Sequence, residues 1–412
     1  MKPWMKMMIS LVLGVVFGLL ISGADWMIPY QPRITDHLGL LGKGFIDLLK
    51  MLVGLLIFCS LVTGICHIND PKKLGRIGVY SFSFFALSTS VAITLGVAIT
   101  SWIKPGQGLH LVAREVITSV SENHLLEFIL GAIPSNPIAA FANGNILQII
   151  VFAVLFAVAM VIAGEKGQKV LGVIESTNDV MCILTNLVMK CAPYGVFVLM
   201  ASAVSAIGWK VVLPLLLVIA CNYLCCFIQI FAVFGLVLKY LIGIRLVSFF
   251  QGMKEAILVA ITTCSSAATL PVSLECIRQR LGVSKELSAV VMALGSTINM
   301  NGAAIGQAVA AIFIAQAYHI EMTWFKIAIL FTTALMSAIG AAGIPGTGLI
   351  MLSVVLNAIG LPLEGIALVA GVDRLREMMS TVTNILGDAV ATLYVAKKEQ
   401  QFEKQSYRVL TT

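Results

Sequence analysis

Charge is the scarcest feature of this 412-residue sequence. Asp, Glu, Lys and Arg together make up 11% of it, while hydrophobic residues make up 59%. A soluble domain normally carries about a quarter charged residues. A water-soluble globule of this length would have too little polar surface to cover itself, so the composition excludes that class of protein.

The sequence also lacks the residue clusters that mark enzymes and channels. The five His are dispersed, and no Ser/His/Asp or metal-ligand grouping is present, so we expect no enzyme. The nine Cys lie mostly in apolar runs without a C-x-x-C pair, as small packing residues in helices would. No repeated filter segment or ring of charge is visible, which leaves a channel or a receptor as a remote alternative.

What the sequence does contain is a series of apolar runs that are nearly free of charge. A helix needs about 20 apolar residues to cross the hydrocarbon core of a bilayer, and several runs reach or approach that length. They therefore predict an all-α membrane protein. The runs are Met7 to Ile21, Ile46 to Ile65, Phe82 to Ile103, Ile146 to Ala163, Val211 to Leu238 and Ile327 to Ile344.

The first run resembles a signal peptide in one respect, because Lys2 and Lys6 precede it. It continues towards Trp26 without a clear A-x-A cleavage site, so we expect it to be retained as the first span. In all we predict eight transmembrane helices, at residues 4–28, 36–66, 76–103, 127–164, 173–205, 209–242, 284–318 and 363–397.

Two further apolar segments, at 250–279 and 324–360, are interrupted near their centres. The first interruption runs from Cys264 to Pro271 and the second from Gly340 to Gly346. Proline removes a backbone donor and small residues favour a turn, so neither segment fits one straight helix. Irregular backbone at membrane depth survives only where it is buried or lines a cavity. We therefore predict two re-entrant hairpins, and such paired interruptions indicate the binding site of a transporter.

Basic residues are distributed unevenly between the two sides of this topology. The net charge of +7 is thus explained by the positive-inside rule rather than by nucleic acid binding. With both termini cytoplasmic, the hairpins enter from opposite faces, as inverted repeats require. The residues assigned to the cytoplasmic side are Lys2, Lys6, Lys72, Lys73, Arg76, Lys166, Lys169, Lys239, Arg245, Lys254, Arg278, Arg280, Lys285, Lys397, Lys398, Lys404 and Arg408. The external side carries Arg33, Lys104, Arg114, Lys210 and Lys326.

The seventh predicted span contains the polar segment Gly295-Ser-Thr-Ile-Asn-Met-Asn-Gly302. Unwinding of the helix there would free carbonyl oxygens, which are suitable ligands for Na⁺ or K⁺. The alternative is a polar contact between helices, with Asn and Ser as hydrogen-bonding residues.

The eighth predicted span carries three carboxylates within one stripe. At about 100° per residue, they share a sector of roughly 80° with Ser380 and Asn384. A charge near the centre of a membrane helix costs about 2.5–3.5 kcal/mol, so such residues mark an ion or substrate path. Ion pairing with Arg374 and Arg376 offers an alternative for the first two carboxylates, but not for the third, which lies three turns deeper. The three are Asp373, Glu377 and Asp388.

At these residues the sequence resembles the dicarboxylate/amino acid:cation symporter family, the glutamate transporter homologues. The resemblance runs over nearly the whole chain and rests on short motifs in the family's order. They are Lys50-Met-Leu, Ile133-Pro-Ser-Asn-Pro137, Asn145-Ile-Leu-Gln148, Ala192-Pro-Tyr-Gly-Val196, the Ser-rich hairpin tip, Asn299-Met-Asn-Gly302, the Gly343–Gly346 turn, and Asn384 with Gly387-Asp388.

The resemblance implies a homotrimer in which one domain slides across the membrane against a fixed scaffold, an elevator mechanism. Scaffold helices 1 and 2 would occupy residues 1–75, and scaffold helices 4 and 5 residues 105–207. The transport domain would comprise helix 3 at 76–104 and residues 208–412, with helices 6, 7 and 8 and both hairpins.

The resemblance also implies two sites for coupling cations. One uses backbone carbonyls and the carboxylate of Asp388, and the other uses main-chain oxygens. The residues of the first are Gly295, Asn299, Asn384 and Asp388, and those of the second are Thr297, Ala338, Ile339 and Ala341. A third site of the family requires an Asp where this sequence has Asn301 and a Tyr where it has Phe85, beside Ser88 and Thr89. A neutral amide weakens cation binding, so we expect two sites rather than three.

The substrate site implied by the resemblance also departs from the family pattern. Its residues would be Ser265, Ser266, Ala303, Ala342, Gly343, Glu377, Ser380, Thr381 and Asn384. The Asp that takes the substrate's amino group in the family is Glu377 here, one methylene longer. The Arg that pairs with an acidic substrate side chain is Ser380 here, and its alternative position is Cys264. A second buried carboxylate would then lack a counter-charge, unless Arg376 supplies one.

The sequence therefore predicts a secondary active symporter of a bacterial-type inner membrane that imports amino acids, driven by Na⁺ or alternatively by protons. A small neutral amino acid is slightly favoured as the substrate. Acidic amino acids such as glutamate or aspartate, and dicarboxylates, stay open as alternatives.

Overall fold

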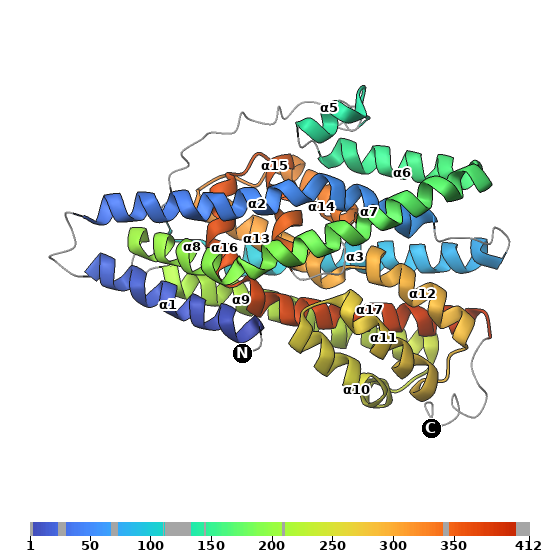
Figure 1. Ribbon diagram of the computed structural model, residues 1–412. Helices are drawn as coiled ribbons and strands as arrows, with labels where there is room; N and C mark the ends of the chain where they lie inside the picture. The colour runs from blue at the N-terminus through green and yellow to red at the C-terminus, as the bar shows by residue number, and fades with distance from the viewer. Residues whose placement is uncertain are drawn as a thin grey trace.

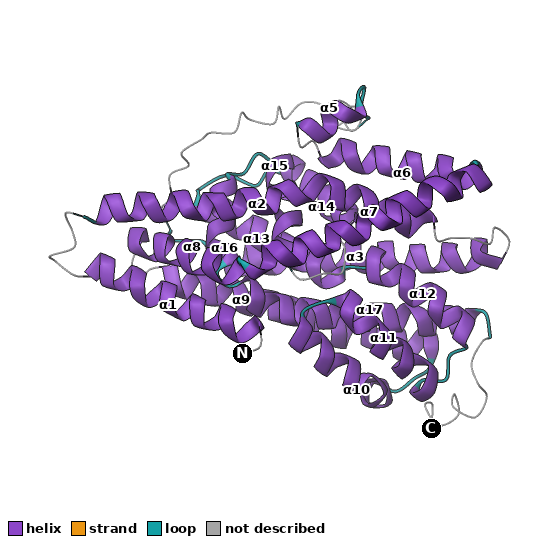
Figure 2. Ribbon diagram, viewed as in Figure 1, coloured by secondary structure: helices purple, strands orange, loops and turns teal. Residues whose placement is uncertain are grey.

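A computed structural model describes residues 3–23, 30–66, 73–109, 111, 133–143, 146–207, 211–340 and 346–400. Within these ranges every regular element is a helix, and the helices form one elongated bundle (Figures 1 and 2). The expected all-α fold is confirmed for the described part of the chain. Two groups of helices can be distinguished by the neighbours against which they pack.

The first group is built around α2, which packs against α6, α7 and α8, while α1 packs along α8 (Figure 1). Small residues bring α1 and α8 close together. A methyl group on Gly14 would lie 2.7 Å from the carbonyl oxygen of Phe197, and one on Gly18 would lie 2.7 Å from Cβ of Val204. The group comprises α1 (Pro3–Gly23), α2 (Gln31–Cys66), α5 (Pro137–Ala142), α6 (Ile146–Ile162), α7 (Glu165–Lys190) and α8 (Ala192–Ile207).

The second group surrounds α13 and α17, which pack against each other and against α3 and α9. It comprises α3 (Lys73–Ile103), α9 (Val212–Phe227), the π-helical turns Ile228–Phe234 and Val237–Ile242, α10 (Leu246–Thr263), α11 (Ser266–Glu275), the π-helical turn Cys276–Arg280, α12 (Lys285–Ile298), α13 (Asn301–Ala317), α14 (Trp324–Gly340), α15 (Thr347–Ala358), the 3₁₀ turn Leu363–Gly365, α16 (Ile366–Ala370) and α17 (Asp373–Lys398). The groups meet where α2 contacts α12, α14 and α15, and where α8 contacts α16.

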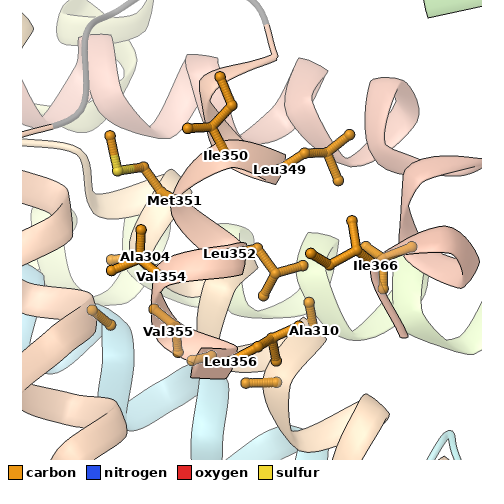
Figure 3. Close-up of a cluster of buried hydrophobic side chains, with 14 of the residues drawn as sticks. Ala304, Ala310, Leu349, Ile350, Met351, Leu352, Val354, Val355, Leu356 and Ile366 are labelled. Atoms are coloured by element: carbon orange, nitrogen blue, oxygen red, sulfur yellow. The ribbon is translucent and has the colours of Figure 1, made fainter. Parts of the chain in front are cut away.

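Two clusters of buried apolar side chains hold these helices together. One spans both groups and includes the buried face of α15, from Leu349 to Leu356, packed against α13 and Ile366 of α16 (Figure 3). The other surrounds the second half of α17 and includes Phe234 and Phe249. Dispersion contacts between closely packed side chains stabilise such clusters.

Three described stretches are long and apolar enough to cross a membrane by length and composition: Arg76–Ile103, Val212–Ile242 and Leu287–Ala317. Large apolar side chains also remain exposed along the outer helices, among them Leu20, Leu40 and Ile183. Exposed apolar surface on this scale indicates contact with lipid or another apolar partner.

Three of the predicted spans are unexpectedly divided into shorter helices. The span at 363–397 consists of the 3₁₀ turn Leu363–Gly365, α16 and α17. The described part of the span at 127–164 consists of the short α5 and then α6. The span at 173–205 consists of two helices, because α7 begins earlier, at Glu165, and ends at Lys190. Pro193 lacks the N–H that would continue the α7 hydrogen-bond ladder, so α8 starts anew at Ala192.

Both interrupted segments form helix pairs that pack against each other, α10 with α11 and α14 with α15. The first interruption is shorter than expected. Cys264 adopts a left-handed conformation (φ 50°, ψ 41°) and ends α10, and Ser265 begins α11. Pro271 lies inside α11 without ending it, so the expectation that this proline belongs to the break was wrong. The second break falls between Gly340 and Thr347, and residues 341–345 lie outside the described part.

Candidate functional site

The seventh predicted span is interrupted at the expected polar segment. The helix α12 ends at Ile298, and α13 begins at Asn301. Between them, Asn299 (φ −108°, ψ 69°) and Met300 (φ −98°, ψ 58°) are non-helical and buried. The interruption releases backbone groups from the helical ladder beside the middle of α17.

A buried chain of hydrogen bonds runs from α3 through this interruption to α17. The hydroxyls of Ser88 and Thr89 each lie 3.1 Å from Oδ1 of Asn301 and donate to it. Nδ2 of Asn301 donates to Oδ1 of Asn299 over 2.8 Å. Nδ2 of Asn299 in turn donates to Oδ1 of Asp388 over 2.9 Å. Three elements distant in sequence are thereby joined around one carboxylate.

Asp388 is 2% exposed and sits where the backbones of α12 and α17 come very close. A methyl group on Gly295 would lie 2.5 Å from its Oδ1, and one on Gly387 would lie 2.7 Å from Nδ2 of Asn301. Within the part of the chain that the structure describes, Asp388 forms no ion pair and is stabilised by Asn299. A buried carboxylate of this kind needs compensation from hydrogen bonds or from a cation.

Asn384 and Ser380, about one and two turns before Asp388 on α17, line the start of α13. Oδ1 of Asn384 accepts from the backbone N–H of Gly302 over 2.7 Å, and its Nδ2 lies 3.3 Å from the sulfur of Met300. A methyl group on Gly302 would lie 2.1 Å from the carbonyl oxygen of Ser380, so only glycine allows this approach. Thr381 is also buried, and Ala303 is half-buried on α13.

The N-terminal end of α17 carries two ion pairs, and each joins residues one turn apart. Nη1 of Arg374 donates to Oε2 of Glu377 over 3.1 Å, and Nη2 of Arg376 donates to Oδ1 of Asp373. Ion pairing therefore accounts for Asp373 and Glu377, as one of the two interpretations of the sequence allowed. Among the described residues Asp388 has no such partner, and it remains the carboxylate that ion pairing does not explain.

Arg376 lies among α9, α13 and the start of α15, where a methyl group on Gly348 would lie 3.6 Å from its Nη2. Its guanidinium occupies the space left by Gly306 on α13, where a methyl group would lie 1.7 Å from Nη1. Asn222 on α9 donates to the backbone oxygen of Arg376 over 3.4 Å, and its Oδ1 lies 3.4 Å from the same methyl position. Arg376 is thus enclosed among α9, α13, α15 and α17 with Asp373 as its counter-charge.

Arg374 and Glu377 instead connect the two hairpins. Nη2 of Arg374 donates to the carbonyl oxygen of Thr263, at the end of α10, over 3.2 Å. Oε1 of Glu377 accepts from the backbone N–H of Gly346, before α15, over 2.8 Å. At the first hairpin tip, Ser265 caps α11 by accepting from the N–H of Ala268 over 3.1 Å, and Ser266 is buried beside it. Ala341, Ala342 and Gly343 lie outside the described residues.

The residues expected at the second cation site lie on two helices that pack against each other. Thr297 is on α12, where its hydroxyl donates to the carbonyl oxygen of Leu294 over 3.1 Å. Ala338 is buried and Ile339 half-buried near the end of α14. Phe85, expected at the doubtful third site, is buried on α3, and its carbonyl oxygen accepts from Ser88 over 3.3 Å.

Residues 4–398 match the model of the sodium:dicarboxylate symporter family. This chain belongs to that family. It is similar to the C4-dicarboxylate transport protein of Edwardsiella ictaluri, with 33% identity over 99% of this chain and 95% of the relative. The C4-dicarboxylate transport protein of Rhodospirillum rubrum is 35% identical over 97% of this chain and 89% of its own length. The proton/sodium-glutamate symport protein of Bacillus caldotenax is 31% identical over 97% of this chain and 95% of its own length.

Membership of the sodium:dicarboxylate symporter family makes this protein a cation-coupled membrane transporter of the dicarboxylate/glutamate type. The resemblance drawn from the motifs is confirmed. In this symporter, α17 brings Glu377, Thr381, Asn384 and Asp388 next to the broken helix and the first hairpin tip.

Several buried polar residues of this symporter were not predicted from the sequence. Arg374 was considered only as a counter-ion, and Gln229 and the Gln307–Ser337 pair were not considered at all. Nε2 of Gln229 donates to the carbonyl oxygen of Ser88 over 3.1 Å, and Nε2 of Gln307 donates to Oγ of Ser337 over 3.0 Å. The two glutamines could have been found from the sequence as side-chain amides within apolar runs, because polar residues in membrane helices normally face a partner.

Proposed function

We propose that this protein is a cation-coupled symporter whose substrate is a C4-dicarboxylate. One structural observation supports this choice over an amino acid. Both oxygens of Glu377, the residue expected to receive an ammonium group, are already engaged, one by Arg374 and the other by the N–H of Gly346. An ammonium placed at Glu377 would share its single negative charge with Arg374, whereas a dicarboxylate has no ammonium to place.

The names of the relatives support the same choice. Several proteins that are about one-third identical over nearly the full chain are named C4-dicarboxylate transport proteins. These names give no support to a small neutral amino acid as the substrate, which the lack of an arginine at Ser380 and Cys264 had favoured. The Bacillus caldotenax relative, named for glutamate, keeps an acidic amino acid as the second candidate.

The proposed path of substrate and cations follows α17. The substrate would lie between the hairpin tips, at Ser265, Ser266 and the 341–346 turn, and contact Glu377, Thr381 and Asn384. The first cation would lie at Asp388, with carbonyls from the broken helix, and the second near Thr297 and the end of α14. Carbonyl and carboxylate oxygens at an unwound helix are typical ligands for a coupling Na⁺, although a buried carboxylate also suits a proton.

Transport would proceed by an elevator movement in a homotrimer in a bacterial inner membrane, with both termini cytoplasmic. The second group of helices would be the moving domain, and the first group, centred on α2, would be the scaffold. This division follows the packing of the two groups, since each has more extensive contacts within itself than with the other.

Uptake into proteoliposomes tests this function. We expect labelled succinate to accumulate with an inward Na⁺ gradient and to be displaced by fumarate and malate at least about tenfold better than by alanine or serine, a difference of about 1.4 kcal/mol. If aspartate or glutamate competes better than succinate, the second candidate is correct. Equal competition by alanine or serine would reject both candidate substrates. Repeating the uptake assay with a proton gradient in place of the Na⁺ gradient identifies the ion that drives transport.

A further inference from the structure

Two arginines lie at the N-terminal end of α17, and the structure gives them different surroundings. At about 100° per residue, Arg374 shares a sector of about 60° with Glu377, Thr381 and Asp388, while Arg376 lies about 100° outside it. Arg374 therefore lies on the same helical face as the proposed substrate and cation residues, and Arg376 does not.

The contacts of Arg374 place its guanidinium between the two hairpins. One nitrogen bonds the carbonyl oxygen of Thr263, directly before the first hairpin tip. Another bonds Glu377, which holds the N–H of Gly346 at the second hairpin. A continuous chain of contacts thus runs from one tip to the other, and a substrate held between the tips lies next to Arg374.

Arg374 also has hydrogen-bonding capacity to spare. A guanidinium carries five N–H donors in a planar fork. The described contacts use one donor on each terminal nitrogen, and Nε is buried without a hydrogen-bond partner among the described residues. A buried, unpaired donor on a charged group costs free energy, and a carboxylate is the ligand that satisfies such a fork best.

Arg376 has the opposite character. Its side chain is 4% exposed, Asp373 neutralises it, and its surroundings come from α9, α13 and Gly348 at the start of α15, without a hydrogen bond to the first hairpin tip in the described part of the chain. Its Nε also lacks a hydrogen-bond partner among the described residues, but Oδ1 of Asn222, a buried acceptor without a partner in the same part of the chain, lies in the same enclosed space. This cluster has the composition of a structural contact between helices.

We infer that Arg374 is the specificity-determining residue that recognises the second carboxylate of the substrate, in place of the arginine missing at Ser380 and Cys264. The inference rests on the proposed function, since it requires a dicarboxylate. It implies that Arg374 is shared between Glu377 and the substrate. A substrate with a neutral group in place of the carboxylate that faces Arg374 would then bind weakly.

The test compares succinate with succinamate, its monoamide, which replaces one carboxylate by a neutral amide of similar size. The measurement is the ligand concentration that gives half-maximal thermal stabilisation of the purified full-length protein in Na⁺, because a ligand that binds the native state stabilises it whether or not transport occurs. The wild-type protein should prefer succinate at least tenfold. Arg374→Gln should reduce this preference to less than threefold, and Arg374→Lys should retain part of it.

Two further variants separate recognition from a structural role. Arg376→Gln removes the same charge from the same helix and should keep the full preference for succinate. If Arg374 only neutralises Glu377, the double variant Arg374→Gln/Glu377→Gln would restore the preference, whereas the inference expects it to stay lost. Restoration in the double variant, a preserved tenfold preference in Arg374→Gln, or its loss in Arg376→Gln instead would overturn the inference. A wild-type protein with no preference for succinate rejects the proposed function itself.

Discussion

Nδ2 of Asn299 donates a hydrogen bond to Oδ1 of Asp388 over 2.9 Å, and the two residues are 89 positions apart in the sequence. The bond joins the broken helix α12–α13 to the middle of α17. The side chain of Asn299 is held in turn by Asn301, so the carboxylate lies at the end of an ordered chain of amides. The relationship makes Asp388 the central residue of the proposed cation site.

Replacing Asp388 by Asn should abolish the dependence of uptake on the cation gradient. The substitution removes the charge that compensates a bound cation and leaves an amide facing another amide. We expect Na⁺ activation of succinate uptake to fall at least about tenfold, or about 1.4 kcal/mol. Asp179→Asn, the same chemical change at an exposed position of α7, is the matched control and should behave like the wild type. Unchanged Na⁺ activation in Asp388→Asn would remove this residue from the cation site.

The number of coupled cations should be lower than in relatives that have a carboxylate at the position of Asn301. Its Oδ1 already accepts from Ser88 and Thr89, and its N–H donates to Asn299, so the neutral network is satisfied without a cation. Reversal potentials of proteoliposomes report the charge and ion count per solute. We expect two Na⁺ per solute, and three would show that the third site exists without its acid.

The variant Asn301→Asp offers a matched test of the same site. In the wild type, Nδ2 of Asn301 donates to Oδ1 of Asn299 over 2.8 Å. In the variant, a carboxylate oxygen would replace this donor and repel Oδ1 of Asn299, and a cation bound between the two oxygens would relieve the repulsion. Uptake by this variant should therefore depend more steeply on Na⁺ concentration than uptake by the wild type. A shallower or unchanged dependence would argue that Ser88 and Thr89 do not belong to a latent cation site.

Substituting Gly302 by Ala should destabilise the packing of α13 on α17. The added methyl group would lie 2.1 Å from the carbonyl oxygen of Ser380, which is backbone and cannot move aside freely. Such overpacking typically costs about 1–3 kcal/mol. Thermal unfolding in detergent should show a lowered midpoint. Gly172→Ala on α7, where a methyl group meets no atom within 4 Å, should be neutral or stabilising by about 0.5–1 kcal/mol.

The buried pair Gln307–Ser337 should help to hold α14 of the second hairpin against α13. Nε2 of Gln307 and Oγ of Ser337 lie 3.0 Å apart, and both side chains are fully buried. Gln307→Leu leaves the Ser337 hydroxyl without this partner, at a cost of about 1–3 kcal/mol. The double variant Gln307→Leu/Ser337→Ala removes both polar groups and should recover part of the loss in a double-mutant cycle of thermal stability. Additive effects would mean that the two side chains do not interact.

Much of the helical architecture was predictable because it depends on local sequence. Apolar length sets where a helix is able to cross a bilayer, and the small, polar residues at 264–266, 299–301 and 340–346 interrupt helices near the predicted places. Proline was a less reliable guide. Pro193 begins a new helix, whereas Pro271 lies inside α11, because the left-handed Cys264 had already ended the preceding helix.

The candidate site was predictable in composition but not in its contacts. Helical periodicity alone placed Glu377, Asn384 and Asp388 on one stripe of α17, and the cost of charge in a membrane marked that stripe as functional. Periodicity does not say which residue of another helix meets the stripe. The partners of Asp388 and Asn384 come from the break before α13, nearly ninety residues earlier.

The sequence by itself determined the all-helical class, the family and the polar stripe, because each depends on residue type and spacing along the chain. Only the tertiary structure decided between the two arginines of α17. A long arginine side chain is able to reach several neighbours, and the side it takes depends on where other helices leave room. Gly306 on α13 leaves room for Arg376, whereas the carbonyl oxygen of Thr263 draws Arg374 towards the hairpin tips.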